Sequence, residues 1–192
     1  AAGELGYPLP QPAATGTLRG YAAGATAPKP AVLPAGTGKV TFTSGTTGEP
    51  KGVCLSNGHA WRVASALARA LQGLGLRRHL CTLPLPVLLE NIAGGYVSWL
   101  SGATLLAPPL ASLGLAGAAG IDVRAFAAAV DRWQPHSLIL LPQMLKAWVG
   151  ALESGLSPPR SLRFVAVGGG KVAVATLERA RRFGLPVYEG YG

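Results

Sequence analysis

The residues most suited to chemistry lie in one short stretch, residues 41–53, which is rich in hydroxyl side chains and glycines. Gly45 and Gly48 free the backbone to turn, so that successive N–H groups can point at one anion. The hydroxyl groups add hydrogen-bond donors, and Lys51 adds a mobile positive charge. The stretch therefore predicts a phosphate-binding loop, with a polar surface turn as the alternative interpretation. The predicted phosphate-binding residues are Thr43, Ser44, Gly45, Thr46, Thr47, Gly48 and Lys51.

A second candidate is the glycine turn at residues 168–170. With Ala173 it matches the GxGxxA form of a dinucleotide-binding fingerprint, and Glu189 lies about twenty residues further on. Such a unit would place a pyrophosphate at a helix N-terminus and Glu189 on a ribose. An NAD-type module is therefore one alternative, and a non-catalytic domain in which the glycines only allow close packing is another. The NAD-type module leaves the phosphate loop without a role.

The strands and helices that must position these residues are predicted from the alternation of apolar and amphipathic segments along the chain. Apolar runs such as residues 137–141 and 164–167 alternate with longer amphipathic stretches, one of them opened by Asp122 as an N-cap. Strands that alternate with helices predict an α/β fold, with a mostly parallel sheet and helices on both faces. We expect strands at 40–43, 79–83, 103–107, 137–141, 162–167 and 185–189, and helices at 56–73, 88–100, 122–133, 143–154 and 172–183.

In such a sheet, ligands bind at the carboxyl ends of the strands, near a topological switch point. The segments that follow the expected strands include the phosphate loop and residues 84–91, 142–143, 168–170 and 189–192. We therefore expect these segments, which are far apart in the sequence, to meet in one pocket. Residues 1–38 are rich in Pro, Ala and Gly and predict an extended segment, which leaves 39–192 as an α/β subdomain.

Composition excludes some classes of function. The net charge of +9 comes from scattered basic residues with no basic helix or stripe interleaved with aromatics, so no nucleic acid partner is expected. Pro108 and Pro109 interrupt the longest uncharged stretch, so we expect no stable membrane span and a cytoplasmic location. Cys54 and Cys81 are expected to be reduced core thiols without histidine partners at metal-binding spacing, and no metal site is predicted within the chain.

The order of residues at 41–53 resembles the phosphate-loop motif of the adenylate-forming enzymes, which include AMP-forming acyl-CoA synthetases and luciferases. Residues 189–192, Glu-Gly-Tyr-Gly, resemble a later motif of the same family, and residues 83–91 resemble the acyl-pocket segment of its long-chain acyl-CoA synthetase branch. The resemblance covers residues 34–192. It implies the central part of the large N-terminal domain, because the initiating Met, a further N-terminal region and a C-terminal subdomain with a catalytic lysine are missing.

The resemblance also implies roles for single residues. Lys51 is the implied catalytic residue, since its charge compensates the departing pyrophosphate. Tyr191 would stack on adenine. The implied adenine and AMP site is Gly168, Gly169, Gly170, Glu189, Gly190, Tyr191 and Gly192, and the implied acyl pocket is Val87, Glu90, Asn91 and Gly94. For Glu90, a local capping or pairing role is an equal alternative, and none of His59, His79 and His136 is given a catalytic role.

The activity implied is that of an ATP-dependent, AMP-forming ligase. A fatty acid or related carboxylic acid would react with ATP, in the presence of Mg²⁺, to give an acyl-adenylate, and coenzyme A would then accept the acyl group. The expected partners are therefore ATP and a small carboxylic acid, together with the missing regions of the parent chain. We expect the 192 residues alone to show little or no turnover.

Overall fold

The computed structural model describes residues 32–43, 51–116 and 120–190, and the chain divides into two units at Gly38 and Lys39. In the described part of the first unit, Pro34 and Thr37 close a turn. The carbonyl of Pro34 accepts hydrogen bonds from the backbone N–H of Thr37 at 3.2 Å and from its hydroxyl at 2.6 Å. Gly36 within this turn has a φ of +79°, a conformation that glycine adopts at little cost.

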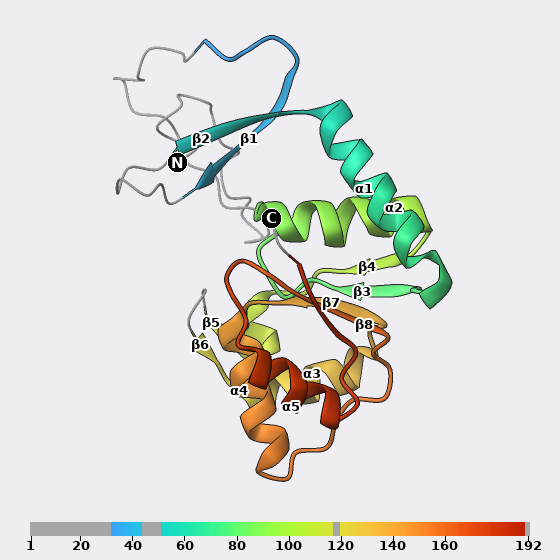
Figure 1. Ribbon diagram of the computed structural model, residues 1–192, viewed down its shortest axis with the longest axis vertical. Coiled ribbons are helices and arrows are strands. Elements are labelled where there is room, and N and C mark those ends of the chain that lie inside the picture. The colour runs from blue at the N-terminus through green and yellow to red at the C-terminus, as the bar shows by residue number, and fades with distance from the viewer. Residues whose placement is uncertain (1–31, 44–50, 117–119, 191–192) are drawn as a thin grey trace, which may run out of the picture. The chain divides into compact units, whose positions relative to one another are not determined.

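The second unit alternates strands and helices along most of its length (Figure 1). The strands are β1 (Thr37–Thr43), β2 (Lys51–Ser56), β3 (Arg78–Leu80), β4 (Thr104–Leu106), β5 (Leu115–Ala116), β6 (Gly120–Ile121), β7 (Ser137–Leu140), β8 (Phe164–Val167) and β9 (Val187–Glu189). The helices are α1 (Asn57–Leu71), α2 (Val97–Ser101), α3 (Val123–Trp133), α4 (Pro142–Glu153) and α5 (Val174–Arg182), with a π-helix at Glu90–Tyr96 and short 3₁₀ turns at Gln72–Leu74 and Leu110–Leu113.

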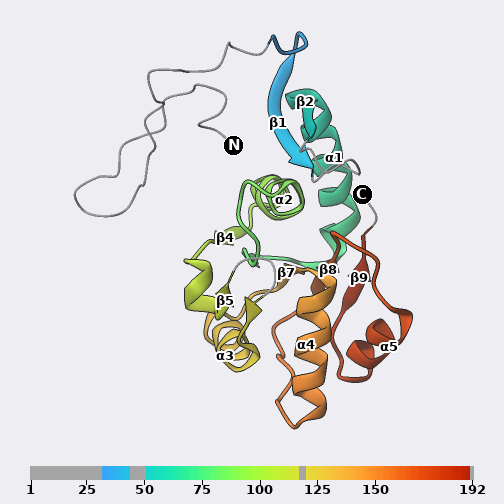
Figure 2. The same ribbon diagram turned by 90° about the vertical axis from the view of Figure 1, so that its left-hand side faces the viewer.

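Five strands form one parallel sheet in the order β4-β3-β7-β8-β9. Helices α1 and α2 lie on one face of it, and α3, α4 and α5 lie on the other, as Figure 2 shows from the side. The predicted α/β class, with a mostly parallel sheet covered on both faces, is confirmed. The order reverses its direction at β3, because the chain passes from β3 to β4 on one side and later returns to β7 on the other.

The first predicted strand does not belong to this sheet. The strand predicted at 40–43 is longer, β1, and it pairs with β2 in a separate two-stranded sheet that the sequence analysis missed. The seven residues at 44–50 are too few for the dozen or so that a helical crossover requires, so β1 and β2 cannot form a βαβ unit. Lys51 accordingly lies at the start of a strand and is exposed.

The remaining predicted elements agree with the structure to different degrees. Asp122 caps α3 as predicted, and its Oδ1 accepts the N–H groups of Arg124 and Ala125 at 3.0 and 3.1 Å. The predicted helix 88–100 corresponds to the π-helix and α2, so its first part is wound more widely than an α-helix. Between the strand predicted at 103–107 and the helix predicted at 122–133, where no strand was expected, the structure has the short antiparallel pair β5 and β6.

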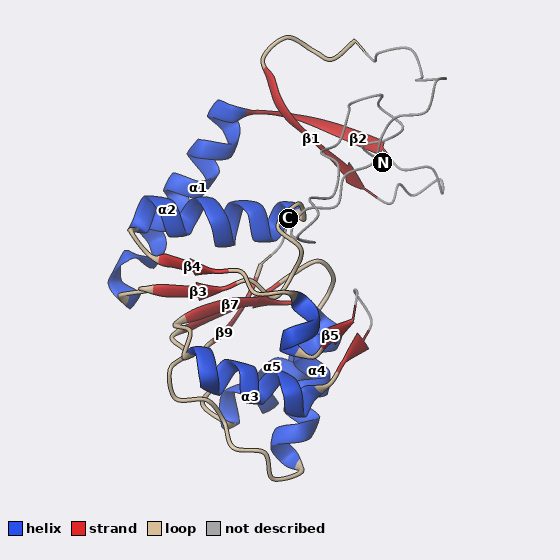
Figure 3. Ribbon diagram, turned by 180° about the vertical axis from the view of Figure 1, so that it is seen from behind, coloured by secondary structure: helices blue, strands red, loops and turns tan. Residues whose placement is uncertain are grey.

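The main core lies between the sheet and helices α3 to α5, which Figure 3 shows from behind. Phe126 and Trp148 are fully buried there and meet edge to face, with ring centroids 5.1 Å apart. Burying a side chain of this size stabilises a fold by about 2 to 3 kcal/mol. A smaller cluster of Ala60, Ala64, Ile92 and Val97 packs α1 against the π-helix and α2. No described helix has both the length and the apolar character needed to cross a membrane.

Candidate active site

The reversal at β3 defines where a ligand can enter the sheet. The segment after β3 leads to α2 on one face, whereas the segment after β7 leads to α4 on the other, so the carboxyl ends of these two strands are where such a fold is expected to bind a ligand. Thr82, just beyond β3, ties the two sides together, because its hydroxyl donates to the carbonyl of Ile139 in β7. Four of the segments that were predicted to converge follow strands of this sheet.

These four segments meet at close range. The N–H of Gly168 donates to Leu140 of β7 at 3.1 Å, and that of Gly190 donates to Val167 of β8 at 2.9 Å. A Cβ atom at Gly168 would lie 3.0 Å from Leu89 Cδ2 and 3.6 Å from the carbonyl oxygen of Gly190. Gly168 therefore allows the segment after β3 and the segment after β9 to approach one another, as predicted, whereas a single pocket lined by all of these segments stays a prediction.

The turn after β8 is held by Glu189 at the end of β9. Gly169 has a φ of +80°, so glycine is required there, and Glu189 Oε1 accepts the N–H of Val172 at 3.2 Å. One oxygen of this carboxylate is thus engaged by the chain itself, in the position where an NAD-type module would present it to a ribose.

The predicted acyl-pocket residues divide into two pairs. Val87 is 41% exposed and Asn91 is half-buried, and the Asn91 side-chain oxygen accepts a hydrogen bond from Lys39. The ammonium of Lys39 also lies 4.6 Å from the centre of the Tyr96 ring. Glu90 and Gly94, in contrast, are buried. The role of the four residues in acid binding stays a prediction.

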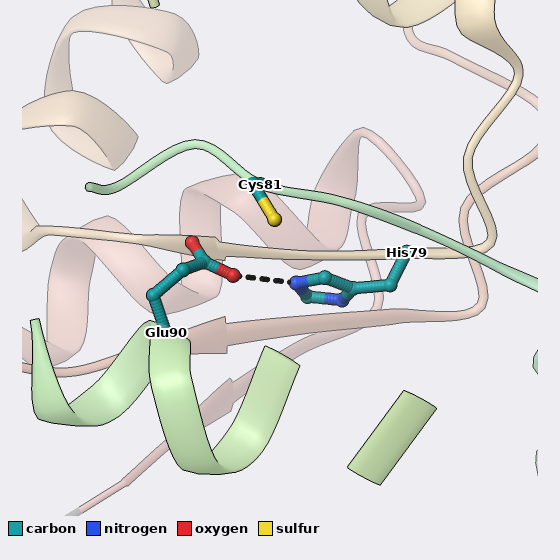
Figure 4. A group of neighbouring side chains, drawn as sticks. All are labelled: His79, Cys81 and Glu90. Carbon is teal, nitrogen blue, oxygen red and sulfur yellow. Dashed lines mark hydrogen bonds and ion pairs between the residues drawn. The ribbon is translucent and has the colours of Figure 1, made fainter. Parts of the chain in front are cut away.

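Glu90 is the centre of a buried polar cluster with His79 and Cys81, which Figure 4 shows. Its Oε1 lies 2.7 Å from Nε2 of His79, and its Oε2 accepts the N–H groups of Thr82 and Leu83 at 3.1 and 3.0 Å. The other ring nitrogen of His79 lies 3.0 Å from the hydroxyl of Ser137 in β7. The local pairing of Glu90 that was kept as an alternative is therefore present.

Cys81 corrects one expectation from the sequence. It is a free, buried thiol as predicted, but it has a histidine neighbour, because ligand atoms of His79, Cys81 and Glu90 all lie within 4.8 Å of one another. Burial raises the pKa of the Cys81 thiol to about 12, and the nearby charge of Glu90 and a hydrogen bond to it add to the effect. Cys54 is free as well but only partly buried.

Comparison with known proteins agrees with this arrangement. The model of the AMP-binding enzyme family matches residues 12–192 of the chain. The chain belongs to the AMP-binding enzyme family. It is 32% identical to the 2-succinylbenzoate–CoA ligase of Bacillus mycoides over 162 residues, which are 80% of this chain and 29% of that ligase.

Two solved structures of the O-succinylbenzoate coenzyme A synthetase (MenE) of Bacillus subtilis share the fold of this AMP-binding chain. The complex with AMP superposes with a TM-score of 0.62 at 25% identity, over 82% of this chain and 37% of that one. The complex with ATP and a magnesium ion superposes with a TM-score of 0.57 at 27% identity, over 80% of this chain and 29% of that one. The chain thus spans between 29% and 37% of the length of these relatives.

Several predicted site residues of the AMP-binding chain lie outside the described residues. These are Ser44, Gly45, Thr46, Thr47, Gly48, Tyr191 and Gly192. Thr43 ends β1 and Lys51 begins β2, so the two ends of the predicted phosphate loop are placed in neighbouring strands of one small sheet. Their contacts with a nucleotide stay predictions.

The sequence analysis missed His79 and Ser137 as neighbours of Glu90. His79 is separated from Glu90 by eleven positions and from Ser137 by fifty-eight, so no short motif joins them. The signal that could have found them is position within strands. His79 and Ser137 each lie at the start of an apolar strand that parallel pairing places side by side.

Proposed function

We propose that the protein containing this chain is an ATP-dependent, AMP-forming ligase that joins a carboxylic acid to a thiol. The observation that carries the proposal is the extent of the family match, residues 12–192, which includes every segment at the carboxyl edge of the sheet. In the first step, a carboxylate oxygen would attack the α-phosphorus of ATP, and the bond to the bridging oxygen would break to release pyrophosphate. In the second, a thiolate would attack the acyl carbon and release AMP.

The acid is proposed to be aromatic rather than a long-chain fatty acid. The long-chain branch was predicted from residues 83–91, whereas the relatives reported above are ligases of 2-succinylbenzoate, whose name describes a benzoate ring. Coenzyme A is the proposed acceptor because the names of these relatives include it. Fatty acids are therefore controls in the test below.

The chain's own residues would bind and orient the nucleotide. Lys51 and the predicted phosphate loop would neutralise charge on the phosphates, and the turn at Gly168 to Gly170 would accept the nucleotide close to the backbone. Tyr191 would stack on adenine. Residues that lie beyond both ends of this chain in its longer relatives are proposed to complete the site.

Magnesium does not fit the donor set that the described residues offer. The one group among them that could hold a metal contains an imidazole, a thiol and a single carboxylate, whereas Mg²⁺ requires oxygen ligands in octahedral geometry. Although Mg²⁺ is bound with ATP in the related B. subtilis structure, no step in this proposal is therefore assigned to it through these residues.

Acid-dependent ATP–pyrophosphate exchange would test the proposal in the complete protein. We expect exchange with aromatic acids such as 2-succinylbenzoate, and little or none with fatty acids of similar size. Product analysis with coenzyme A should then show the aryl-acid thioester and AMP. The proposal is wrong if no acid in a broad panel supports exchange, or if NAD binds more tightly than AMP and the Glu189→Ala substitution abolishes NAD binding.

A further inference from the structure

Glu90 makes more hydrogen bonds than a surface carboxylate would, and all of them go to one short part of the chain. It is fully buried, and it contacts the N–H groups of Thr82 and Leu83 on one oxygen and His79 on the other. Its three partners precede the turn at residues 84–89, and Glu90 itself follows that turn. Because a buried N–H without a partner costs about 1 to 3 kcal/mol, this carboxylate fixes the ends of the turn.

The geometry favours hydrogen bonding over metal binding in this cluster. The 2.7 Å between Glu90 Oε1 and His79 Nε2 is a hydrogen-bond distance, whereas two ligands of one zinc ion, each about 2.0 Å from the metal in tetrahedral geometry, would be separated by more than 3 Å. Oε2 is already occupied by two donors, and the thiol of Cys81 is protonated at neutral pH because its pKa is about 12.

Gly94 shows how closely the cluster is packed. A Cβ atom at this position would collide with Glu90 Oε1 and would lie 2.6 Å from His79 Nε2. The neighbouring Gly95 differs, since a Cβ atom there would meet only the backbone oxygen of Glu90, at 3.9 Å. The π-helix therefore needs glycine at 94 to place its backbone against the His79–Glu90 pair, and it does not need glycine at 95 for that reason.

The turn that Glu90 fixes borders the proposed substrate site. Leu89 reaches Gly168 at the carboxyl edge, while Leu85 and Val87 are 39% and 41% exposed and form an apolar surface in the same turn. An apolar surface is suited to the hydrocarbon part of an acid rather than to the phosphates of ATP. A shift of this turn by about 1 Å would therefore alter the apolar surface that is offered to the acid.

We propose that Glu90, through its hydrogen bonds to His79, Thr82 and Leu83, is a positioning residue that sets the acid-binding surface of the proposed ligase. This inference rests on the proposed function. Glu90 itself does not touch the acid; it determines where Leu85, Val87 and Leu89 lie. A change that breaks the hydrogen bonds should therefore weaken binding of the acid and leave binding of ATP unaffected.

The first test compares Glu90→Ala with Glu90→Gln by ATP–pyrophosphate exchange in the complete protein. Glutamine can accept the two backbone N–H groups and donate to His79, whose other nitrogen can then donate to Ser137. We expect Glu90→Ala to raise KM for the acid by about 10- to 100-fold, since a 1 Å misplacement costs about this much. KM for ATP should not change, and Glu90→Gln should restore most of the acid affinity. A merely structural loss would lower the active fraction, and so kcat, without changing KM.

The second test uses Gly94→Ala, with Gly95→Ala as its matched control, and remains informative if Glu90→Ala fails to fold. Gly94→Ala should raise KM for the acid, and Gly95→Ala should not.

A third measurement tests the hydrogen bonds directly. Amide hydrogen exchange should be faster at Thr82 and Leu83 in Glu90→Ala than in Glu90→Gln.

Three results would overturn the inference. If the wild-type protein is active and KM for the acid is unchanged in both Glu90→Ala and Gly94→Ala, the positioning role of Glu90 is wrong and the proposed function still stands. One equivalent of Co²⁺ bound by the wild type with a thiolate absorption band, and lost in Glu90→Gln, would make the cluster a metal site. If the wild-type protein shows no acid-dependent ATP–pyrophosphate exchange, the proposed function is wrong, and the role of Glu90 in acid binding is wrong as well.

Discussion

The two ends of the parallel strands are held by different chemistry. At the carboxyl ends, a buried carboxylate binds backbone N–H groups, and glycines allow segments to approach one another. At the amino ends, the residues that directly precede β3, β7 and β8 are Arg77, His136 and Arg163. His136 Nδ1 accepts the N–H of Arg77 at 3.0 Å, and Arg163 donates to the carbonyls of Leu74 and Gly75 at 3.3 and 3.0 Å.

The polar groups at the two ends of the strands differ in burial, and this predicts different effects of mutation. At the carboxyl ends the polar groups are inside, where a lost partner cannot be replaced by water, so small changes there move the backbone around a site. At the amino ends the cationic side chains are at the surface, and water can replace what they lose. We therefore expect changes at the carboxyl ends to alter chemistry and changes at the amino ends to alter stability and its pH dependence.

The largest expected difference concerns the two thiols. Cys81 should react with iodoacetamide at pH 8 more slowly than Cys54 by about 1000-fold or more, because burial and a pKa of about 12 leave almost no reactive thiolate. Labelling followed by mass spectrometry of peptides would measure both rates, and denaturant should abolish the difference. Similar rates in the folded protein would show that the buried cluster is open to solvent.

The next effect concerns the proposed reaction itself. Lys51→Ala should slow acyl-adenylate formation by about 100- to 1000-fold, the usual cost of removing one preorganised donor, with the fold intact because Lys51 is exposed. Transfer from preformed acyl-adenylate to the thiol should change much less, since pyrophosphate has already left. Arg163→Ala, at the amino ends of the strands, is the control and should leave both half-reactions unchanged. Equal slowing of both half-reactions by Lys51→Ala would exclude a role on the departing phosphates.

The smallest effect is a pH dependence at the amino ends. Burial, followed by the charges of Arg163 and Arg78, lowers the pKa of His136 below its ordinary 6.5. The unfolded chain then binds the proton more readily, so the contribution of His136 to stability is complete above pH 6.5 and is lost as the pH falls through that value. His136→Asn, whose side-chain oxygen can still accept the N–H of Arg77, should make the free energy of unfolding fall less steeply between pH 7.5 and 5.5.

Urea titrations of wild type, His136→Asn and the exposed control His59→Asn at several pH values would measure this. We expect His59→Asn to follow the wild type. A constant difference between His136→Asn and wild type at every pH would show that His136 does not titrate with folding.

The sequence predicts those parts of the fold that depend on local patterns. The N-cap at Asp122, the apolar strand that became β7 and the order of strands and helices all follow from spacing that a short window contains. The convergence of Gly168 and Gly190 follows from parallel topology, because strand ends in such a sheet share one edge.

The sequence does not predict features that depend on unusual winding or distant pairing. The π-helix that carries Glu90 has no 3.6-residue signature of its own, and it turns Glu90 toward His79 and the N–H of Thr82. Likewise, β2 was not predicted because the stretch at residues 41–53 was interpreted as a phosphate-binding loop, although Val53 and Leu55 lie in a strand. In both cases, a contact between elements decides the structure.

The order of the sheet also has a consequence for how the chain folds. β3 pairs with β4, β7 with β8 and β8 with β9, each of them the next strand of this sheet along the chain, whereas β3 must also find β7 across more than fifty residues. Closing that long segment costs entropy before any contact compensates for it, and such pairings slow folding. We therefore expect the part from β7 to β9 to acquire protection first in pulse-labelled hydrogen exchange, and the pairing of β3 with β7 to form last, so that the proposed substrate site is completed only when the whole sheet has closed.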